Sequence, residues 1–407
     1  MLTASDNRLL TLVEGDAPMG AMLRSHYWVP AAISEKLVSD GAPLRVRLVG
    51  RDYVVFRSTD GRVGCFDERC PHRSASLALA RNEDNALRCI FHGWKFSVDG
   101  KCVEVPTEVS DQKRFCESVP IKAHPTREAS GIVWVWLGDS DPAVFPSFEF
   151  MGLPECQRVP MRQALHYNWL QGVEGTMDSA HVGVLHTSWL REIARGSGHA
   201  HAAGENRAPR YEIDEQPYGF RYAAHRSLEE GGIYTRVNVF VMPWFGFICP
   251  GDKPDGDRTA IFSVPADNEH SVHWMVKYNP YRELSSPYQT MFSDPANWPP
   301  APGTPENVWG QDRELMRHGS FTGFTHVTTE DFAVASSAGP IADRTNEFLN
   351  SGDLAIVRLR RQLLNAVREF EDGRQPTLAD HAAIDYGSIR PVADKIAKES
   401  DWRSITA

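Results

Sequence analysis

Two short segments of this 407-residue chain each carry one cysteine and one histidine, and this pairing constrains the fold more than any other feature. Cys70 and His72 lie in a C-P-H run, and Cys89 and His92 lie in a C-I-F-H run. Two thiolates and two imidazoles bind either a structural zinc ion or a [2Fe-2S] cluster in which two histidines replace two cysteines. Zinc sites usually pair C-x-x-C with H-x3-5-H, whereas each segment here supplies one ligand of each kind, which favours the cluster. On spacing alone, zinc stays open.

The sequence around these segments is typical of a small β domain. Short apolar or alternating runs are separated by Asp60-Gly61 and Asp99-Gly100, where glycine supplies the positive φ that hairpin turns require. The runs predict strands over residues 44–48, 53–57, 63–66, 86–91 and 131–137. We therefore expect an all-β domain around the two Cys/His segments.

The rest of the chain has a different pattern, and its length exceeds what one hydrophobic core usually supports. A proline-punctuated segment at 141–160 predicts a linker, and hence two domains over residues 1–140 and 141–407. Apolar runs predict an antiparallel sheet, and helical spacing predicts a C-terminal helix over 353–371 with Ser351 as its N-cap. The predicted strands cover residues 211–213, 220–224, 234–242, 245–248, 260–264 and 272–278, and the predicted loops cover 196–210 and 285–305. The fold class is therefore α+β.

Composition excludes several classes of protein. The net charge of -10 argues against a non-specific nucleic-acid-binding protein, which needs a basic surface to displace counterions from phosphates. No run approaches the roughly twenty apolar residues of a membrane span, and the N-terminal residues lack the apolar core of a signal peptide. We therefore expect a cytoplasmic protein. Its 7 cysteines, an odd number, indicate free thiols and a metal site rather than a disulfide scaffold.

A second group of potential ligands lies in the predicted second domain. Glu174, Asp178 and His181 are spaced i, i+4 and i+7, which predicts one stripe along a helix. His186 would lie roughly 140° away from His181 on that helix, so a shared metal requires the helix to end or distort, which we expect near Gly183. Two histidines and a carboxylate form the facial triad of non-haem Fe(II) enzymes, which leaves positions open for dioxygen and substrate. The alternative is a polar helix face with two surface histidines.

The first pair of segments resembles a known family. The runs C-P-H-R from Cys70 and C-x-x-H-G-W from Cys89 are similar to the Rieske [2Fe-2S] domain of aromatic-ring-hydroxylating oxygenases. The resemblance implies that Cys70 and Cys89 bind one iron of the cluster and that His72 and His92 bind the other. Histidine ligation leaves less negative charge on the cluster than four thiolates, so its potential is higher and it can accept electrons from a ferredoxin or a flavin reductase.

The later run N-W-x-Q-x-x-E, followed by D-x-x-H-x4-H, resembles the mononuclear-iron motif of the same family. By this resemblance His181 and His186 bind the iron, and Asp178 bridges rather than binds it. The family forms ring-shaped trimers, in which this aspartate connects a cluster histidine of one subunit, here His92, to an iron histidine of the next, here His181. The chain departs from many members at Gly175, where they have asparagine, so an asparagine contact there is impossible.

The third iron ligand is expected from a carboxylate that is distant in sequence. A T-T-E-D run containing Glu330 and Asp331 opens a predicted helix that stops at Gly339. Members of the phthalate-dioxygenase branch place their iron aspartate at the matching distance before such a Gly-Pro-Ile, so the resemblance implies Asp331, with Glu330 as the second choice. An acidic residue in the first turn of a helix is also common for its interaction with the helix dipole, and that alternative stays open.

Further segments resemble the phthalate-dioxygenase branch, so the resemblance covers nearly the whole chain: 9–11, 18–20, 27–30, 339–344 and 351–353. It implies an oxygenase component that cis-dihydroxylates an aromatic carboxylate, with NADH-derived electrons from a separate flavin and iron-sulfur reductase or a ferredoxin. The branch also includes enzymes that O-demethylate methoxybenzoates, so Rieske monooxygenation is the alternative. From other classes, an electron-transfer Rieske protein or a zinc-stabilised binding protein would not need the second group of ligands.

A carboxylate substrate needs a fixed hydrogen-bond donor, and the planar guanidinium of arginine suits bidentate recognition. Four arginines lie in the segment that is predicted to form the pocket sheet: Arg207, Arg210, Arg221 and Arg236. Each could instead be a solvated or structural arginine. We expect one of them to bind the substrate.

Overall fold

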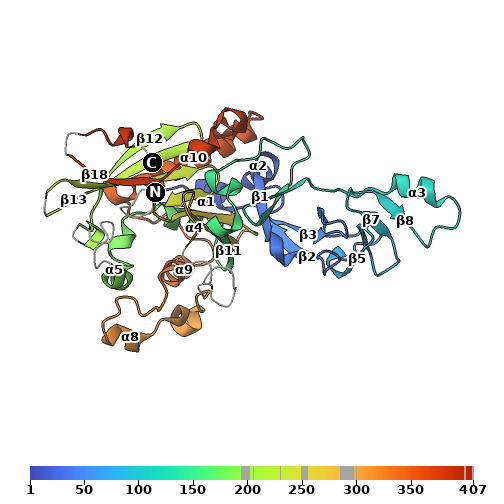
Figure 1. The fold of residues 1–407 in the computed structure, drawn as a ribbon, viewed down its shortest axis with the longest axis horizontal. Helices are drawn as coiled ribbons and strands as arrows, with labels where there is room; N and C mark the ends of the chain where they lie inside the picture. The colour runs from blue at the N-terminus through green and yellow to red at the C-terminus, as the bar shows by residue number, and fades with distance from the viewer. Residues whose placement is uncertain are drawn as a thin grey trace. The chain divides into compact units, whose positions relative to one another are not determined.

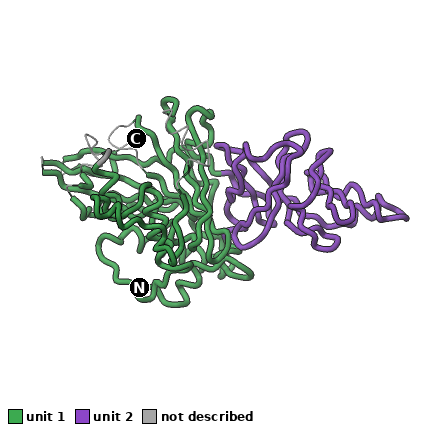
Figure 2. The backbone as a smooth tube through the Cα atoms, turned by 90° about the horizontal axis from the view of Figure 1, so that it is seen from below, with its two compact units in different colours: residues 1–22, 146–407 green, residues 23–145 purple. Residues whose placement is uncertain are grey.

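The computed structural model describes residues 1–193, 202–204, 206–229, 231–248, 255–284, 298, 300–397 and 400–405. The predicted loops at 196–210 and 285–305 lie partly outside these residues. The chain divides into two compact units: unit 1 comprises Met1–Met22 and Pro146–Ala407, and unit 2 comprises Leu23–Phe145 (Figure 2). The N-terminal 22 residues thus belong to unit 1. A division into folding domains after residue 140 stays a prediction.

Unit 2 consists of three small antiparallel sheets (Figure 1). Glycines with positive φ, Gly61 and Gly100, lie at the two predicted hairpin turns. The predicted strand at 86–91 ends earlier, because residues 89–92 form a tight turn. The sheets are β1 (Trp28–Ile33), β10 (Ile132–Trp136) and β9 (Thr126–Ala129); β2 (Leu44–Leu48), β3 (Arg51–Arg57) and β4 (Val63–Asp67); and β5 (Arg81–Glu83), β6 (Ala86–Arg88), β7 (Lys95–Ser97) and β8 (Cys102–Glu104).

The core of unit 2 lies directly behind the Cys/His segments. Phe56, Phe66 and Leu87 are fully buried, and they belong to the same apolar cluster as Cys70 and Cys89. The short helix α3 (Gln112–Ser118), whose N-cap Asp111 accepts a backbone N–H, packs against β8. Fully burying a large apolar side chain stabilises a fold by about 1.5–3 kcal/mol, so this cluster anchors both loops.

Unit 1 is organised around one eight-stranded antiparallel sheet (Figure 1). One edge of β14 pairs with two strands: residues 233–237 pair with β18, and residues 239–241 pair with β15. The strands, in sheet order, are β11 (Arg158–Leu165), β17 (Ser271–Tyr278), β16 (Arg258–Pro265), β15 (Phe245–Ile248), β14 (Ile233–Val241), β13 (Gly219–Ser227) and β12 (Arg210–Gln216), with β18 (Val392–Ile396) beside β14. All six predicted strands of this half are present, and the sequence pattern did not predict β11 and β18.

Helices cover one face of this sheet. The central helix α4 (Trp169–Met177) packs on β15, β16 and β17, and α9 (Val327–Ser337) and α10 (Leu354–Glu371) pack against α4. Helix α10 also contacts α1 (Ala4–Thr11), β12 and β13. Further helices among the described residues include α2 (Pro18–His26), α5 (Thr187–Ile193) and α8 (Arg313–Arg317).

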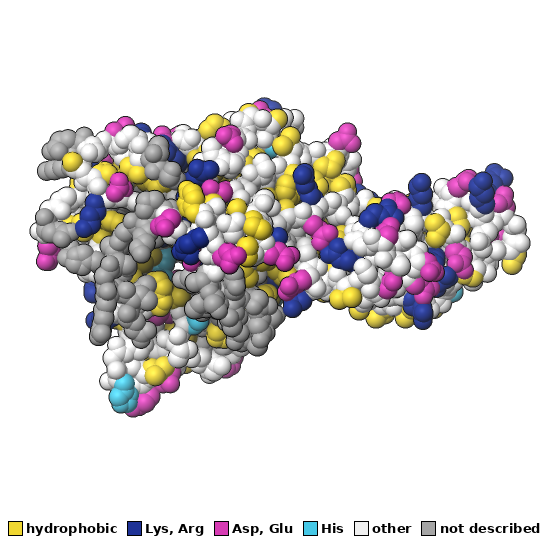
Figure 3. Space-filling model, viewed as in Figure 1, with side chains coloured by type: hydrophobic (Ala, Val, Ile, Leu, Met, Phe, Trp, Pro, Cys, Tyr) yellow, Lys and Arg dark blue, Asp and Glu magenta, His cyan; other side chains and the backbone are white. Residues whose placement is uncertain are grey.

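The sequence pattern explains where α10 lies. Its residues Ile356, Leu359, Leu363 and Val367 recur at helical spacing and are buried. The predicted N-cap was wrong: Ser351 lies in a 3-10 turn that precedes the helix, and the side chain of Asn350 caps that turn instead. Within the described residues, no helix is both long enough and apolar enough to cross a membrane. On the face shown in Figure 3, acidic side chains are interspersed with lysines and arginines.

Candidate metal centres

The two Cys/His loops of unit 2 are built in the same way. In the first loop the backbone N–H of Ser74 donates to the carbonyl of Cys70, and in the second that of Gly93 donates to the carbonyl of Cys89. The backbone N–H of Cys70 donates to Ala75, and that of Cys89 to Trp94, each five residues ahead. Ser74 and Gly93 both have positive φ, at 57° and 76°. The two loops therefore have the same backbone hydrogen bonds, and each carries one cysteine and one histidine.

The donor atoms of these loops fit a cluster with one buried and one more accessible iron. The thiols of Cys70 and Cys89 are 2% and 3% exposed, whereas His72 and His92 are only partly buried. The two imidazole rings lie 4.4 Å apart, and Nδ1 of His92 is buried without a hydrogen-bond partner. His72 stacks on the indole of Trp94 at 4.4 Å, which fixes its ring plane. An unpaired buried nitrogen beside a second imidazole is what a missing metal bond leaves.

The protonation of Cys70 is also informative. Burial raises the pKa of its thiol to about 11, while the backbone N–H groups of His72 and Arg73 act in the opposite direction by donating to sulfur. Without metal the thiol is therefore protonated near neutral pH. Metal ligation requires the thiolate, so assembly of a cluster has to release this proton.

The second group lies in unit 1, and its local structure differs from the predicted helical stripe. Helix α4 ends at Met177, and Asp178 is its C-cap with extended backbone angles. The carboxylate of Asp178 accepts the backbone N–H of Ala180 at 2.6 Å, so it caps the following turn instead of lying beside Glu174 on one helix face. The helix thus ends six residues before Gly183, near which it was expected to end or distort. His181 begins a separate 3-10 turn, His181–Gly183.

Glu174 pairs with arginines rather than with the metal-ligand candidates. Its buried carboxylate binds two arginines, with Arg344 at 2.8 Å and Arg360 at 2.7 Å. Burial would raise the pKa of Glu174, but the two guanidinium groups outweigh this effect and hold the pKa below its usual range. Glu174 therefore fastens α4 to α10 and to the segment before it.

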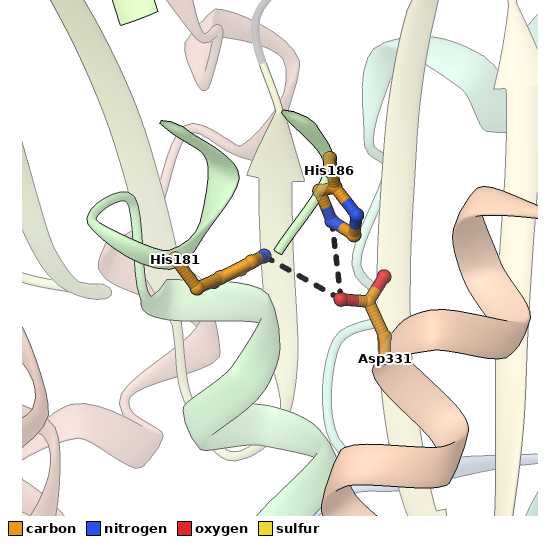
Figure 4. A group of neighbouring side chains, drawn as sticks. All are labelled: His181, His186 and Asp331. Atoms are coloured by element: carbon orange, nitrogen blue, oxygen red, sulfur yellow. Dashed lines mark ion pairs between the residues drawn. The ribbon is translucent and has the colours of Figure 1, made fainter. Parts of the chain in front are cut away.

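Three of the predicted ligands converge on one point (Figure 4). Asp331 on α9 places Oδ1 at 3.5 Å from Nε2 of His181 and 3.2 Å from Nε2 of His186. The donor atoms all lie within 4.8 Å of one another, and the two rings are 5.0 Å apart. Two imidazole nitrogens and one carboxylate oxygen on one side of a point match the donor set of a facial triad.

Carboxylates also lie next to the outer ring nitrogen, Nδ1, of each histidine, the nitrogen that does not face Asp331. Asp178 Oδ2 lies 3.5 Å from Nδ1 of His181, and Glu330 Oε2 lies 2.6 Å from Nδ1 of His186. Burial alone would lower the pKa of His186, but hydrogen bonds to Asp331 and Glu330 reverse this and raise the pKa to about 9. Burial opposes ionisation of Asp178, yet the nearby ring of His181 and the backbone N–H groups of Ala180 and His181 hold the pKa of this carboxyl below its usual range. The contact of Glu330 was not predicted, and its position next to Asp331 was the only available signal.

The four candidate arginines lie in different places. Arg236 on β14 is buried and lies opposite Ala224 of β13. Tyr222, two residues before Ala224, donates its hydroxyl to the carbonyl of Met177 at the end of α4. Arg236 therefore lies on the sheet face that α4 covers, because alternate residues of a strand share a face. Arg207 is exposed and lies against Gly183, in the turn between the two histidines.

The other two arginines point to the opposite face of the sheet. Arg221 forms an ion pair with Asp214 at 2.6 Å and lies over the ring of Trp402. Arg210 is exposed and bonds to Glu212. Of the four, Arg207 thus lies against the turn between the two histidines, and Arg236 lies on the face of the sheet that α4 covers.

Comparisons with known proteins agree with both halves of this arrangement. A family model described as a Rieske [2Fe-2S] domain matches residues 27–123, and one described as LigXa C-terminal domain like matches residues 135–407. The oxygenase subunit of phthalate 4,5-dioxygenase from Pseudomonas putida is 38% identical, over 100% of this chain and 95% of that protein. The chain belongs to the Rieske oxygenase family. It is an oxygenase component, an oxidoreductase that uses O2.

Two further comparisons show the breadth of this Rieske oxygenase family. The oxygenase subunit of 5,5'-dehydrodivanillate O-demethylase from Sphingobium sp. (strain NBRC 103272 / SYK-6) is 31% identical, over 92% of this chain and 83% of that protein. A structure of the oxygenase and ferredoxin complex of carbazole 1,9a-dioxygenase has the same fold, with a TM-score of 0.60 and 18% identity over 88% of this chain and 94% of that one. The expected α+β fold, with an all-β Rieske domain, is confirmed, and so are the expected cofactors, a [2Fe-2S] cluster and a mononuclear iron. Which side chains hold them stays a prediction.

Proposed function

We propose that this Rieske oxygenase component cis-dihydroxylates an aromatic carboxylate of the phthalate type. The observation that carries the proposal is the 38% identity over the whole chain to an oxygenase subunit that acts on phthalate. The reaction joins the aromatic ring, O2, two electrons and two protons into a cis-dihydrodiol, so both oxygen atoms enter the product. In this proposal the electrons come from NADH through a separate flavin and iron-sulfur reductase or a ferredoxin. The complex of a ferredoxin with an oxygenase of the same fold supports a partner of this kind.

Each group of ligands has one task in this proposal. Cys70, Cys89, His72 and His92 hold the cluster, and the second group, His181, His186 and Asp331, holds the iron. When bound, the cluster supplies electrons and the ferrous iron supplies open coordination positions for O2 and substrate. The side chain of Asp331 is 39% exposed and that of His181 is 23% exposed, so a small molecule can reach this second group.

In the proposed assembly, subunits form a trimer in which electrons cross between neighbours. The carboxylate of Asp178 lies 3.5 Å from Nδ1 of His181, and we propose that it also meets His92 of the next subunit. An imidazole that donates its second ring proton to a carboxylate is the usual arrangement around a metal-bound histidine, so Asp178 suits this position.

Arg236 is the proposed anchor of the substrate carboxylate. It is buried on the α4 side of the sheet, where a guanidinium that is shielded from water binds a carboxylate more strongly than an exposed one would. Arg207, against Gly183, is the second candidate. Arg210 and Arg221 already bond to acidic side chains on the other face.

Product analysis tests this proposal. The full chain is incubated with a reductase, NADH and 18O2 across a panel of phthalates and benzoates, and the products are identified by mass spectrometry. We expect a cis-dihydrodiol that carries two labelled oxygen atoms. A product that carries a single labelled atom from every accepted substrate would contradict dioxygenation.

O-demethylation is the second candidate, because one relative that spans 92% of this chain is an O-demethylase. This reaction cleaves a methoxy group and releases formaldehyde. Formaldehyde formed from methoxybenzoates, without a dihydrodiol from any carboxylate of the panel, would establish it instead.

A further inference from the structure

The two ring nitrogens of His186 face two different carboxylates. Nε2 lies 3.2 Å from Asp331 on the side that it shares with His181 (Figure 4), and Nδ1 lies 2.6 Å from Glu330. Glu330 and Asp331 are consecutive residues of α9. The first turn of this helix therefore holds the imidazole ring at both edges.

Glu330 is an unusual carboxylate, because it is 2% exposed. Its second oxygen accepts a hydrogen bond from the hydroxyl of Thr322, which is also buried. No lysine or arginine among the residues that the structure describes forms an ion pair with it. A buried carboxylate needs compensating donors, and His186 and Thr322 supply them here.

His181 is held in a different manner. The atom next to its outer nitrogen is Oδ2 of Asp178 at 3.5 Å, beyond a normal hydrogen bond, and the side chain of Asp178 is 31% exposed. The two histidines thus differ: one is fixed by a short, buried contact within the subunit, and the other keeps a looser, accessible one. A buried hydrogen bond to a charged group is stronger than an exposed one.

We propose that Glu330 is the positioning residue of the iron site. It accepts the Nδ1–H of His186, which fixes the ring orientation and the tautomer that leaves the lone pair on Nε2, facing Asp331 and His181. Glu330 itself stays outside the ligand set, and Thr322 holds its carboxylate in place. This inference rests on the iron site of the proposed function and adds a residue to which that proposal gives no role.

Ferrous iron binding measures this effect without turnover. The full chain with its cluster intact is freed of mononuclear iron, and the dissociation constant for Fe2+ is measured without oxygen against a competing chelator. We expect Glu330→Gln to raise the dissociation constant about 10–100-fold, the usual effect of removing such a partner. Thr322→Val, which deletes one hydrogen bond to Glu330, should raise it by a smaller factor. Asp331→Ala should abolish binding.

Glu149→Gln is the matched control. Glu149 is a largely buried carboxylate of unit 1 that pairs with Arg258, and it makes no contact with the three ligands. Its variant should bind Fe2+ like the unchanged protein, even if it unfolds at a lower temperature. The electron paramagnetic resonance spectrum of the nitric oxide adduct should change in Glu330→Gln and stay unchanged in Glu149→Gln.

The outcomes separate the two proposals. Unchanged affinity and spectrum in both Glu330→Gln and Thr322→Val would overturn the role of Glu330. Complete loss in Glu330→Gln with iron retained in Asp331→Ala would also overturn it, because Glu330 would then be a ligand. If the unchanged protein bound no Fe2+, or if His186→Ala bound it equally well, the iron site of the proposed function would fail instead.

Discussion

His186 determines how the proposed iron site responds to pH. Because its pKa is raised from 6.5 to about 9, the iron-free protein carries a proton on this ring near neutral pH. A metal has to displace that proton before Nε2 can bind. We therefore expect the apparent affinity for Fe2+ to rise about tenfold per pH unit between about 6.5 and 9 and to level off above. Chelator competition over this pH range measures it, and an affinity that does not change with pH would contradict the assignment.

The same protonation affects the stability of the iron-free protein. A raised pKa in the folded state means that the folded chain holds the proton more tightly than the unfolded chain. This contribution to the free energy of unfolding is fully present below pH 6.5 and is lost as the pH rises through about 9. Urea unfolding of the iron-free protein at several pH values checks the sign.

Arg236 is the residue whose role in substrate selection can be tested most directly. Arg236→Gln should raise the Michaelis constant for an aromatic carboxylate about 10–100-fold, because a charge-assisted bidentate contact is worth about 1.5–3 kcal/mol. The effect on the methyl ester should be much smaller, because an ester carries no negative charge. Steady-state kinetics on both compounds measures the difference.

Arg221→Gln provides the control for this experiment, because Arg221 lies on the opposite face of the same sheet and pairs with Asp214. Its variant should leave the ratio between acid and ester unchanged. Equal losses for acid and ester in Arg236→Gln would exclude carboxylate recognition by this residue.

The elements of unit 1 explain why the N-W-x-Q-x-x-E run has its composition. Asn168 caps α4 with its oxygen, and its amide donates to the carbonyls of Thr11 and Asn268. Glu174, six residues further along, binds Arg344 and Arg360. Asn168 and Glu174 therefore fasten α4 to its neighbours.

Gln171 connects α4 to α9, the helix that carries Asp331. Its amide donates to the carbonyls of Ala335 and Gly339, and its oxygen accepts the N–H of Ala342. Gln171→Ala leaves these groups unpaired, so we expect the free energy of unfolding to fall by about 2–4 kcal/mol and the bound iron to fall with it. Urea unfolding and an iron assay measure both quantities.

Gln375→Ala serves as the comparison, because Gln375 is exposed and makes a single bond to Ala379. It should change stability by less than about 0.5 kcal/mol. A loss of stability in Gln171→Ala without any loss of iron would show that α9 keeps its position without this contact.

Sequence patterns predicted the elements of this fold better than their ends. Apolar runs identified six strands of the large sheet, because strands such as β14 and β16 are buried along nearly their whole length and an apolar run is a local property of the sequence. They did not identify β18, whose pairing with β14 joins residues far apart in the sequence. The end of α4 at Met177 was also missed, because Asp178 leaves the helix to bond the turn after it. Local motifs pointed to the cluster candidates and to His181 and His186, and the family resemblance pointed to Asp331. The role of Glu330 depends on a contact across 144 positions that spacing cannot reveal.

At the scale of the whole molecule, each unit carries one candidate centre, so neither is complete as an oxygenase by itself. The cluster loops lie in unit 2, and the three iron-ligand candidates lie in unit 1. The proposed trimer passes electrons from the cluster of one subunit to the iron of its neighbour. This route can be distinguished from one within a single subunit, because the two routes require different pairs of intact centres.

Mixed trimers provide the test. Cys70→Ser removes the cluster and His186→Ala removes the iron, so each variant alone should be inactive. When the two are co-expressed, a subunit with intact iron can receive electrons from a neighbour with an intact cluster. With random assembly of equal amounts, half of the subunits keep iron and half of their neighbours keep the cluster, so roughly a quarter of wild-type activity should return. Trimers that are shown to contain both variants but remain inactive would mean that electrons travel within one subunit, because no subunit then holds both centres.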